Sequence, residues 1–408
     1  MPSKTHHIQK ALYVVSSSNI SVNCTGRGGR DTISGMSEQV LYRKYRPKSF
    51  DEVVGQAHVV GAIKNAFKMG RVAHGFLFSG PRGIGKTSMA RLIAKGLNCT
   101  AKNKNDVPCN ACEQCKDFNE GRAVDVIEID AASNRGIDEI RELREGVRFV
   151  PVRGSYKIYI IDEVHQLTKE AFNALLKTLE EPPSHAVFIL ATTELEKVPA
   201  TIISRTQHYT FRRPGAADIA ERLIVIATKE GTSLKKDAAH LIALAAEGGL
   251  RDAESILGQI MAAEDTEITR EGVEEILGLP KREAVKEMFS LIAKKDAPAA
   301  LILIQTLTES GFDMSYFSKL LLQYFRSAFF LKTDPSLKQF AIADLLPDEA
   351  EHIEKTLTSF SSTELSRGIT ILFHHIQNFK KTPIPQLPLE LAVIELIHGG
   401  EEHAQKKV

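Results

Sequence analysis

Hydrophobic and polar residues follow two alternating patterns along the first half of the chain. Short apolar runs predict strands over residues 75–80, 124–130, 157–163 and 186–193. Apolar residues at helical spacing predict helices over residues 58–70, 86–98, 136–147 and 168–181. Strands that alternate with helices indicate a parallel sheet covered by helices on both faces.

After Pro214 the pattern predicts helices alone. Residues 215–277 predict several short helices with Gly-rich joints. Longer helices are expected over residues 281–295, 298–310, 315–331, 362–379 and 389–399. Several of these have enough apolar surface to pack on more than one neighbour, which predicts an all-helical bundle. We therefore expect an α/β domain over residues 36–214, a small helical domain over 215–278 and a helical domain over 279–400.

The two ends of the chain lack such patterns. Residues 1–35 are rich in Ser, Gly and Asn, which predicts a disordered tail or a start upstream of an initiator at Met36. Residues 401–408 are expected to be a tail. No apolar run approaches the length of a membrane span, so we expect no membrane partner. The net charge is only +1, so a DNA-binding surface would have to be local.

A phosphate-binding motif follows the first predicted strand. Residues 80–87 read Gly-x-x-x-x-Gly-Lys-Thr, between a strand and a helix. In this context the backbone N–H groups of the loop and the start of the helix would hold phosphates. Lys86 can reach the β- and γ-phosphates, and the Thr87 hydroxyl can ligate Mg²⁺. The candidate nucleotide-binding residues are Gly80, Gly83, Gly85, Lys86, Thr87 and Ser88.

An acidic pair at the end of a later strand completes a candidate ATPase site. Asp162 can hold Mg²⁺ or its water shell, and Glu163 can orient or deprotonate an attacking water. Thr193 ends another apolar strand, where its hydroxyl could touch the γ-phosphate or the water. His165 is expected to be structural or exposed, because the acidic pair already supplies the chemistry. Arg251, near the start of a helix, could equally contact phosphate or cap that helix.

Four of the five cysteines cluster in the sequence. Cys99, Cys109, Cys112 and Cys115 are spaced Cys-x9-Cys-x2-Cys-x2-Cys. Four sulfur ligands with no open position are typical of structural Zn²⁺ in a reducing compartment, and we expect the protein to be cytoplasmic. An iron–sulfur cluster is the main competing interpretation, and four unligated thiols are a third.

The phosphate loop, the acidic pair and the cysteines occur in one chain with further recognisable segments. From about Met36 to His398 the chain resembles the γ/τ subunit of the bacterial DNA polymerase III clamp loader, an AAA+ ATPase. The matching segments are LYRKYRPKSFDEVVGQ, GPRGIGKTS, the four-cysteine insert, DAASNRGIDEIRELRE, YIIDEVHQLTKEAFNALLKTLEEPP, ATTELEKVPATIISR and GGLRDAES. The resemblance implies an AAA+ P-loop NTPase domain with a zinc-binding insert at about residues 99–115. A small helical lid domain and an all-α collar domain, which holds subunits in a ring-like pentamer, would follow.

The resemblance also assigns roles to individual positions. The residues that would enclose the adenine and the sugar are Arg46, Pro47, Val53 and Val54. Thr193 falls at the sensor 1 position and Arg251 at sensor 2, which reaches the phosphates of its own ATP. Arg205 falls at the arginine that acts in trans on ATP held by a neighbouring subunit. The family's usual Cys after that arginine is Thr206 in this chain, and the effect of this difference is not predicted.

The implied function is that of a motor subunit within the DNA polymerase holoenzyme, with ATP hydrolysis as its own activity. ATP-bound subunits would open the β sliding clamp and admit primed DNA, and hydrolysis would release the clamp. The expected partners are the δ and δ′ subunits, the clamp, primed DNA and other copies of the chain, which resembles the short γ-type form. Arg135 and the helix after it could meet DNA phosphates, unless Ser133 or Asn134 is merely the cap of that helix.

Two alternatives belong to other classes. A δ′-like structural subunit would share the fold and the cysteines without hydrolysing ATP, but Lys86, Thr87, Asp162 and Glu163 are all intact. A Holliday-junction motor or a protein-remodelling AAA+ enzyme would not require the zinc insert or the helical collar.

Overall fold

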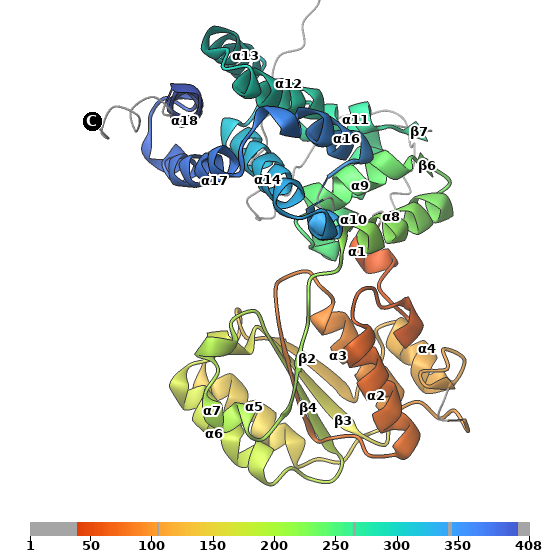
Figure 1. The fold of residues 1–408 in the computed structure, drawn as a ribbon. Coiled ribbons are helices and arrows are strands. Elements are labelled where there is room, and N and C mark those ends of the chain that lie inside the picture. Colours follow the sequence, from red (N-terminus) through yellow and green to blue (C-terminus); the bar gives the residue numbers. More distant parts are fainter. Residues whose placement is uncertain (1–38, 104–105, 264–266, 342–344, 399–408) are drawn as a thin grey trace, which may run out of the picture. The chain divides into compact units, whose positions relative to one another are not determined.

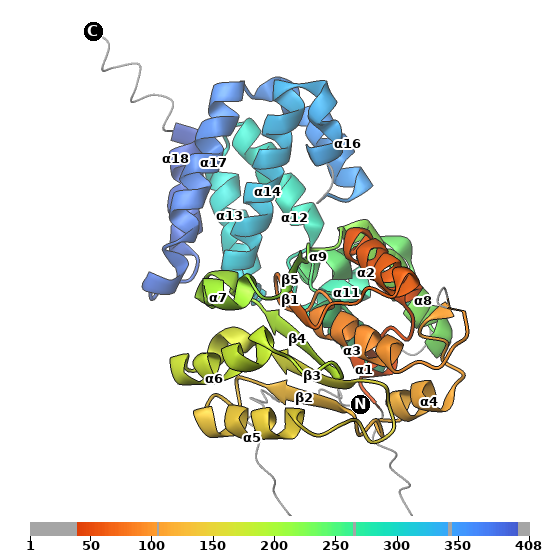
Figure 2. The same cartoon turned by 90° about the horizontal axis from the view of Figure 1, so that it is seen from below.

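The computed structural model describes residues 39–103, 106–263, 267–341 and 345–398. The predicted tails, residues 1–35 and 401–408, and the alternative start at Met36 lie outside the described residues. In the part that is described, five parallel strands form one sheet in the order β2-β3-β4-β1-β5; Figure 1 shows the fold, and Figure 2 labels all five strands. The strands are β1 (Gly75–Ser79), β2 (Val126–Asp130), β3 (Lys157–Asp162), β4 (Ala186–Thr192) and β5 (Gln207–Thr210).

The sheet confirms the four predicted strands and adds one that the pattern did not predict. Strand β5 lies at the edge of the sheet beside β1. Its sequence, QHYT, is polar and mostly exposed. An edge strand of this kind leaves no apolar run in the sequence, so hydrophobic patterning could not find it.

Helices cover both faces of the sheet (Figures 1 and 2). One layer contains α2 (Ala57–Met69), α3 (Lys86–Leu97) and α4 (Glu113–Asn119), and the other contains α5 (Ile137–Val147), α6 (Lys169–Glu180) and α7 (Ala200–Ile203). Alternate strand residues face the two layers: Phe76 and Phe78 pack with α2 and α3, whereas Leu77 packs with the residues of α5 and α6. The continuous apolar strands are therefore buried on both sides, as parallel sheets require.

The segment predicted as the lid has a hydrophobic core of its own. Its helices are α8 (Ala216–Glu230), α9 (Lys236–Ala245), α10 (Leu250–Ala263) and α11 (Arg270–Leu277). Leu41 and Tyr45, at either end of α1 (Leu41–Lys44), pack against this core. The expectation that strands stop at Pro214 was wrong, because β6 (Ser233–Leu234) and β7 (Glu267–Ile268) form a short parallel pair. Two-residue strands are too short to give an alternating pattern.

The segment predicted as the collar is helical. Its helices are α12 (Arg282–Ala293), α13 (Ala297–Glu309), α14 (Met314–Thr333), α15 (Lys338–Ala341), α16 (Pro347–Thr356), α17 (Ser362–Ile376) and α18 (Leu387–His398). The sequence did not predict α15 and α16. The core includes Phe289, whose ring lies 5.1 Å from those of Tyr324 and Phe325. The boundaries after residues 214 and 278 stay predictions. No helix of the described residues has the length and apolar character needed to span a membrane.

Candidate nucleotide site and cysteine cluster

A cleft of about 560 Å³ lies at the carboxyl end of β3 and beside the phosphate loop. Its lining includes most of the predicted site residues, namely Arg46, Pro47, Val53, Val54, Gly83, Gly85, Lys86, Thr87, Ser88, Asp162, Glu163 and Arg251. Gly80, Thr193, Arg135 and Arg205 are not among the lining residues. The fold therefore brings the loop, the acidic pair and the predicted adenine-side residues to one place.

The phosphate loop has the backbone geometry that the glycine positions predict. Gly80, Gly83 and Gly85 have φ of +140°, +77° and +100°. A Cβ on Gly80 would lie only 2.5 Å from the main-chain oxygen of Phe211, so a larger residue does not fit there. Helix α3 begins at Lys86, directly after the loop. Free N–H groups at a helix start together with a glycine-rich turn fit the phosphates of a nucleotide.

Lys86 is buried at the start of α3. Its ammonium group donates hydrogen bonds to the main-chain oxygens of Gly80 and Pro81, both at 2.7 Å. Burial lowers the pKa of Lys86, while the carboxylates of Glu163 and Asp162 act in the opposite direction. The ammonium group of Lys86 therefore faces both the loop and the acidic pair.

The side chains of Thr87 and Asp162 place a hydroxyl and a carboxylate oxygen next to each other. The Thr87 hydroxyl donates to Asp162 Oδ2 at 2.6 Å, and the backbone N–H of Glu163 donates to Asp162 Oδ1 at 2.9 Å. Hydroxyl and carboxylate oxygens are the donors that Mg²⁺ prefers. The chemistry and the position of these two side chains fit a Mg²⁺ bound next to nucleotide phosphates.

Glu163 adopts an unusual backbone conformation. Its φ is +48° and its ψ +44°, a left-handed conformation that residues other than Gly rarely adopt. The Thr193 hydroxyl donates to Glu163 Oε2 at 2.9 Å, and the Thr193 N–H approaches the same oxygen at 3.3 Å. Thr193 therefore reaches the cleft through Glu163, not directly.

Arg251 lies in the first turn of α10 and faces the cleft. Its N–H donates to the main-chain oxygen of Gly83 at 3.2 Å, and its guanidinium lies 4.5 Å from the centre of the Tyr42 ring. Arg251 thus lines the cleft, and its contact with phosphate stays a prediction. Tyr42 and Glu254 also line the cleft; both lie in segments that match the family, but the sequence analysis gave neither a role.

Arg205 follows α7, outside the cleft of its own chain. Its guanidinium contacts Glu180 Oε1 at 2.6 Å and donates to the main-chain oxygen of Thr201 at 2.9 Å. The Thr206 hydroxyl donates to the main-chain oxygen of Ile202 at 3.0 Å, so it helps to close the end of α7. The role of Arg205 in a neighbouring site stays a prediction.

The segment before α5 does not cap that helix as one alternative supposed. Gly136 occupies the N-cap position of α5, and no side chain accepts a hydrogen bond from the N–H groups at the start of that helix. Ser133 Oγ instead donates to Asp130 Oδ2 at 2.9 Å, and the Asn134 side chain donates to the main-chain oxygen of Asp130 at 3.0 Å. The cap interpretation is therefore wrong. The predicted contact of Arg135 with DNA stays a prediction.

The four cysteines converge in space. Their sulfur atoms all lie within 4.8 Å of one another, and Cys99 and Cys115 are buried. Four thiolates around one Zn²⁺ at about 2.3 Å would lie roughly 3.8 Å apart in a tetrahedron, so the arrangement fits such an ion. The cluster is compatible with zinc, and the identity of a bound metal stays a prediction.

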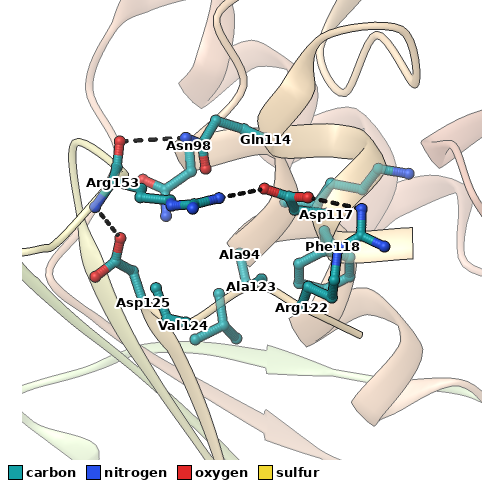
Figure 3. A pocket seen from close by; sticks show the side chains of 12 residues that line it. Ala94, Asn98, Gln114, Asp117, Phe118, Arg122, Ala123, Val124, Asp125 and Arg153 are labelled. Atoms are coloured by element: carbon teal, nitrogen blue, oxygen red, sulfur yellow. Dashed lines mark hydrogen bonds and ion pairs between the residues drawn. The ribbon is translucent and has the colours of Figure 1, made fainter. Parts of the chain in front are cut away.

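A polar seam ties the cysteine-bearing segment to the sheet (Figure 3). Asp117 of α4 accepts hydrogen bonds from Arg153 at 3.2 Å and from Arg122 at 3.0 Å. Asp125, just before β2, accepts the backbone N–H groups of Val152, Arg153 and Gly154. Burial would raise the pKa of Asp125, but these three hydrogen bonds lower it. The cavity between the two carboxylates is only about 10 Å³, so this seam has a structural role and no room for a substrate.

Three family models match successive parts of the chain. Residues 55–215 match "DNA polymerase III, delta subunit", and residues 218–265 match "DNA polymerase III clamp loader subunit, ATPase lid domain". Residues 268–407 match "DNA polymerase III subunits gamma and tau domain III". The order of the three matches follows the order of the expected domains.

Curated relatives match over most of the chain. The chain is 39% identical to DNA polymerase III subunit tau of Bacillus subtilis over 90% of its own length, and it spans 65% of that relative. It is 38% identical to DNA polymerase III subunit gamma of Buchnera aphidicola over 74% of its own length and spans 83% of that protein. Among solved structures, the Thermotoga maritima RuvB Holliday junction branch migration motor is 20% identical with a TM-score of 0.45, over 60% of this chain and 78% of that one.

Proposed function

Since the chain belongs to the DNA polymerase III gamma/tau family, we propose that it is the ATPase motor subunit of a clamp loader. The observation that carries the proposal is the joint placement of Lys86, Thr87, Asp162 and Glu163 around one cleft. Each residue has the side chain that ATP hydrolysis needs at that position.

The roles that we propose follow from the chemistry of these side chains. Lys86 and the loop N–H groups hold the β- and γ-phosphates and neutralise their charge. Thr87 and Asp162 hold Mg²⁺, which supplies charge stabilisation at the transferred phosphoryl group. Glu163 orients the attacking water and accepts its proton, and Thr193 holds the Glu163 carboxylate in place.

The remaining residues are assigned to the nucleotide or to other molecules. Arg251 senses the phosphates of its own ATP, and Arg205 stabilises the charge on ATP in a neighbouring subunit. Arg135 contacts phosphates of primed DNA. The residues that we propose to enclose the adenine and sugar are Arg46, Pro47, Val53 and Val54. In the cysteine cluster we propose a structural Zn²⁺.

We propose that ATP binding opens a sliding clamp and that hydrolysis releases it around primed DNA. The partners would be δ and δ′ subunits, the β clamp and further copies of this chain. The alternative of a non-hydrolysing, δ′-like subunit is disfavoured because all four catalytic side chains are present and converge.

The test is reconstitution with δ and δ′ subunits, a β clamp and primed DNA. We expect ATP turnover that rises when clamp and DNA are added, and capture of the clamp in ATP but not in ADP. Lys86→Ala is the control that should lose both properties. An assembly that neither turns over ATP nor captures the clamp would disprove the proposal.

A further inference from the structure

His165, which was expected to be structural or exposed, lies between the side chains of Glu163 and Glu194. It belongs to the short helix η3 (Val164–Gln166) that follows Glu163, and only 2% of its side chain is exposed. Its two ring nitrogens face in different directions. Nδ1 faces Thr192 and Glu163, and Nε2 faces Glu194 and the side chain of Gln166, which lies 3.0 Å away.

The contacts on the Nδ1 side lead to the proposed catalytic base. Nδ1 is 2.9 Å from the Thr192 hydroxyl and 3.5 Å from Glu163 Oε2. The second distance is too long for a strong hydrogen bond but short enough for attraction to a carboxylate. The same Glu163 oxygen accepts the hydroxyl hydrogen of Thr193. His165 and Thr193 thus both approach one oxygen of Glu163.

The contacts on the Nε2 side lead to the segment that ends in Arg205. Nε2 is 3.1 Å from Glu194 Oε1, and the other Glu194 oxygen pairs with Lys197 at 2.7 Å. The pKa of Glu194 is lowered chiefly by its hydrogen bond to Lys197. Glu194 is therefore a carboxylate that accepts hydrogen bonds, and it precedes helices η4 (Leu195–Lys197) and α7.

The backbone of Glu163 explains why such support is needed. A left-handed conformation at a residue other than Gly is strained, and it persists only where the surroundings hold it. A catalytic base must also stay within a fraction of an ångström of its working position. Side chains that fix its carboxylate therefore contribute to turnover without touching the nucleotide.

We infer that His165 is a positioning residue for ATP hydrolysis, which links the Glu163 carboxylate to Thr192 and Glu194 at the end of β4. This inference rests on the proposed function, because it assigns Glu163 as the base. His165 acts through Glu163 and has no direct contact with ATP in this assignment. Its effect should therefore appear in the rate of turnover and not in the binding of ATP.

The test compares three variants of His165 in the reconstituted assembly. In His165→Asn the side-chain nitrogen takes the place of Nδ1, so the contact with Thr192 is kept. In His165→Gln the amide takes the place of Nε2, so only the contacts on the Nε2 side, with Glu194 and Gln166, are kept. His165→Ala removes both. We expect kcat to fall about tenfold in Ala and Gln and to recover within about threefold of wild type in Asn, with the Kd for ATP unchanged throughout.

His185→Asn is the matched control. In wild type the His185 imidazole is partly buried, and its Nε2 lies 3.0 Å from the main-chain oxygen of Val147. His185 directly precedes β4, at the opposite end of that strand from Glu194. The control variant should lose stability comparably and keep kcat. The inference would be overturned if kcat were equal in wild type and all three His165 variants. It would also be overturned if the loss of kcat simply followed the loss of melting temperature. Both outcomes would leave the proposed function intact. Failure of the proposed function would appear separately, as wild-type protein that does not turn over ATP.

Discussion

Glu163 is the residue on which hydrolysis should depend most. Replacing its carboxylate with an amide in Glu163→Gln keeps the size of the side chain but removes the proton acceptor. We expect turnover to fall by at least about 10²-fold. ATP should still bind, because Lys86, Thr87 and Asp162 persist, and the clamp-bound state should accumulate.

The measurement is steady-state ATP hydrolysis beside equilibrium binding of ATP. Glu196→Gln, which changes an acidic residue of η4 outside the cleft, is the control and should behave as wild type. Turnover of Glu163→Gln within about threefold of wild type, roughly 0.65 kcal/mol of barrier, would show that Glu163 is not the base.

Glu254 makes folding stability depend on pH. This carboxyl is buried in the cleft wall, and burial raises its pKa to about 7, an effect that Arg222 only partly offsets. In the unfolded chain the pKa is near the ordinary value, so between the two values the folded state binds more protons. The stability contributed by the protonated carboxyl is therefore complete at low pH and is lost as pH rises through about 7.

Glu254→Gln removes this titration. Between about pH 5 and about pH 8, the free energy of unfolding of the variant should rise relative to wild type by about 2 kcal/mol. Urea unfolding at the two pH values measures this difference. Glu275→Gln, an exposed change on α11, should give no such trend. A difference that is the same at both pH values would contradict the raised pKa.

At the residue scale, the sequence predicted the parts of the site that a linear motif encodes. The phosphate loop and the acidic pair are such motifs, and the cleft gathers them as expected. Glu254 and Tyr42 lie in segments that match the family but were given no role, because their place in the cleft depends on how α10 and α1 pack against distant residues. The left-handed backbone of Glu163 also follows from tertiary contacts and not from any preference of Glu.

At the scale of elements, the cysteine segment has polar anchors as well as its sulfur atoms. Lys95 of α3 is buried and donates to the Asn119 side chain, at the end of α4, at 2.6 Å. Asp117 of α4 pairs with Arg153 in the loop before β3. A segment of this polarity cannot form a core by itself, so a metal ion at the four thiolates would complete its fold.

Removing one cysteine should therefore release the metal and loosen the segment. We expect about one zinc per chain in purified protein and loss of that zinc in Cys112→Ser. Hydrolysis should fall much less than in Glu163→Gln, since none of the four clustered cysteines lines the cleft. Elemental analysis and limited proteolysis provide the readouts, with Cys24→Ser as a control that should retain zinc. Iron in place of zinc, or freshly purified protein without metal, would rule out a zinc site.

The elements that could be predicted are those with strong hydrophobic patterns. Strands β1 to β4 and helices α2, α3, α5 and α6 were found close to their observed bounds, whereas the short helix α4 was not predicted. Helix α16 was missed because its sequence, PDEAEHIEKT, is strongly polar and contains few apolar residues to mark a buried face. It is held instead by its contacts, since buried Glu349 pairs with Arg282 of α12 at 3.2 Å. Such an element depends on its partner, which a local pattern does not contain.

At the scale of the whole molecule, the position of Arg205 raises the question whether this arginine acts on ATP bound to its own chain or to another subunit. The guanidinium is partly exposed, pairs with Glu180 and does not line the cleft of its own chain. An arginine that stabilises a transferring phosphoryl group is worth on the order of 10³–10⁵ in rate in GTPase systems. If Arg205 has this role, it must serve ATP bound to another subunit.

Mixing two inactive variants tests this arrangement. Chains with Arg205→Ala keep an intact phosphate loop, and chains with Lys86→Ala keep an intact arginine. Each variant alone should hydrolyse little ATP. In mixed assemblies with δ and δ′ subunits, some intact loops lie beside intact arginines, so activity stimulated by clamp and DNA should return at intermediate mixing ratios.

Arg71→Ala, which changes an exposed arginine just after α2, is the control and should keep wild-type activity. An arginine that acts within its own chain predicts no recovery at any ratio, because no site would then contain both groups. Absence of recovery in assemblies whose mixed composition is confirmed by mass would therefore reject the role of Arg205 in a neighbouring site.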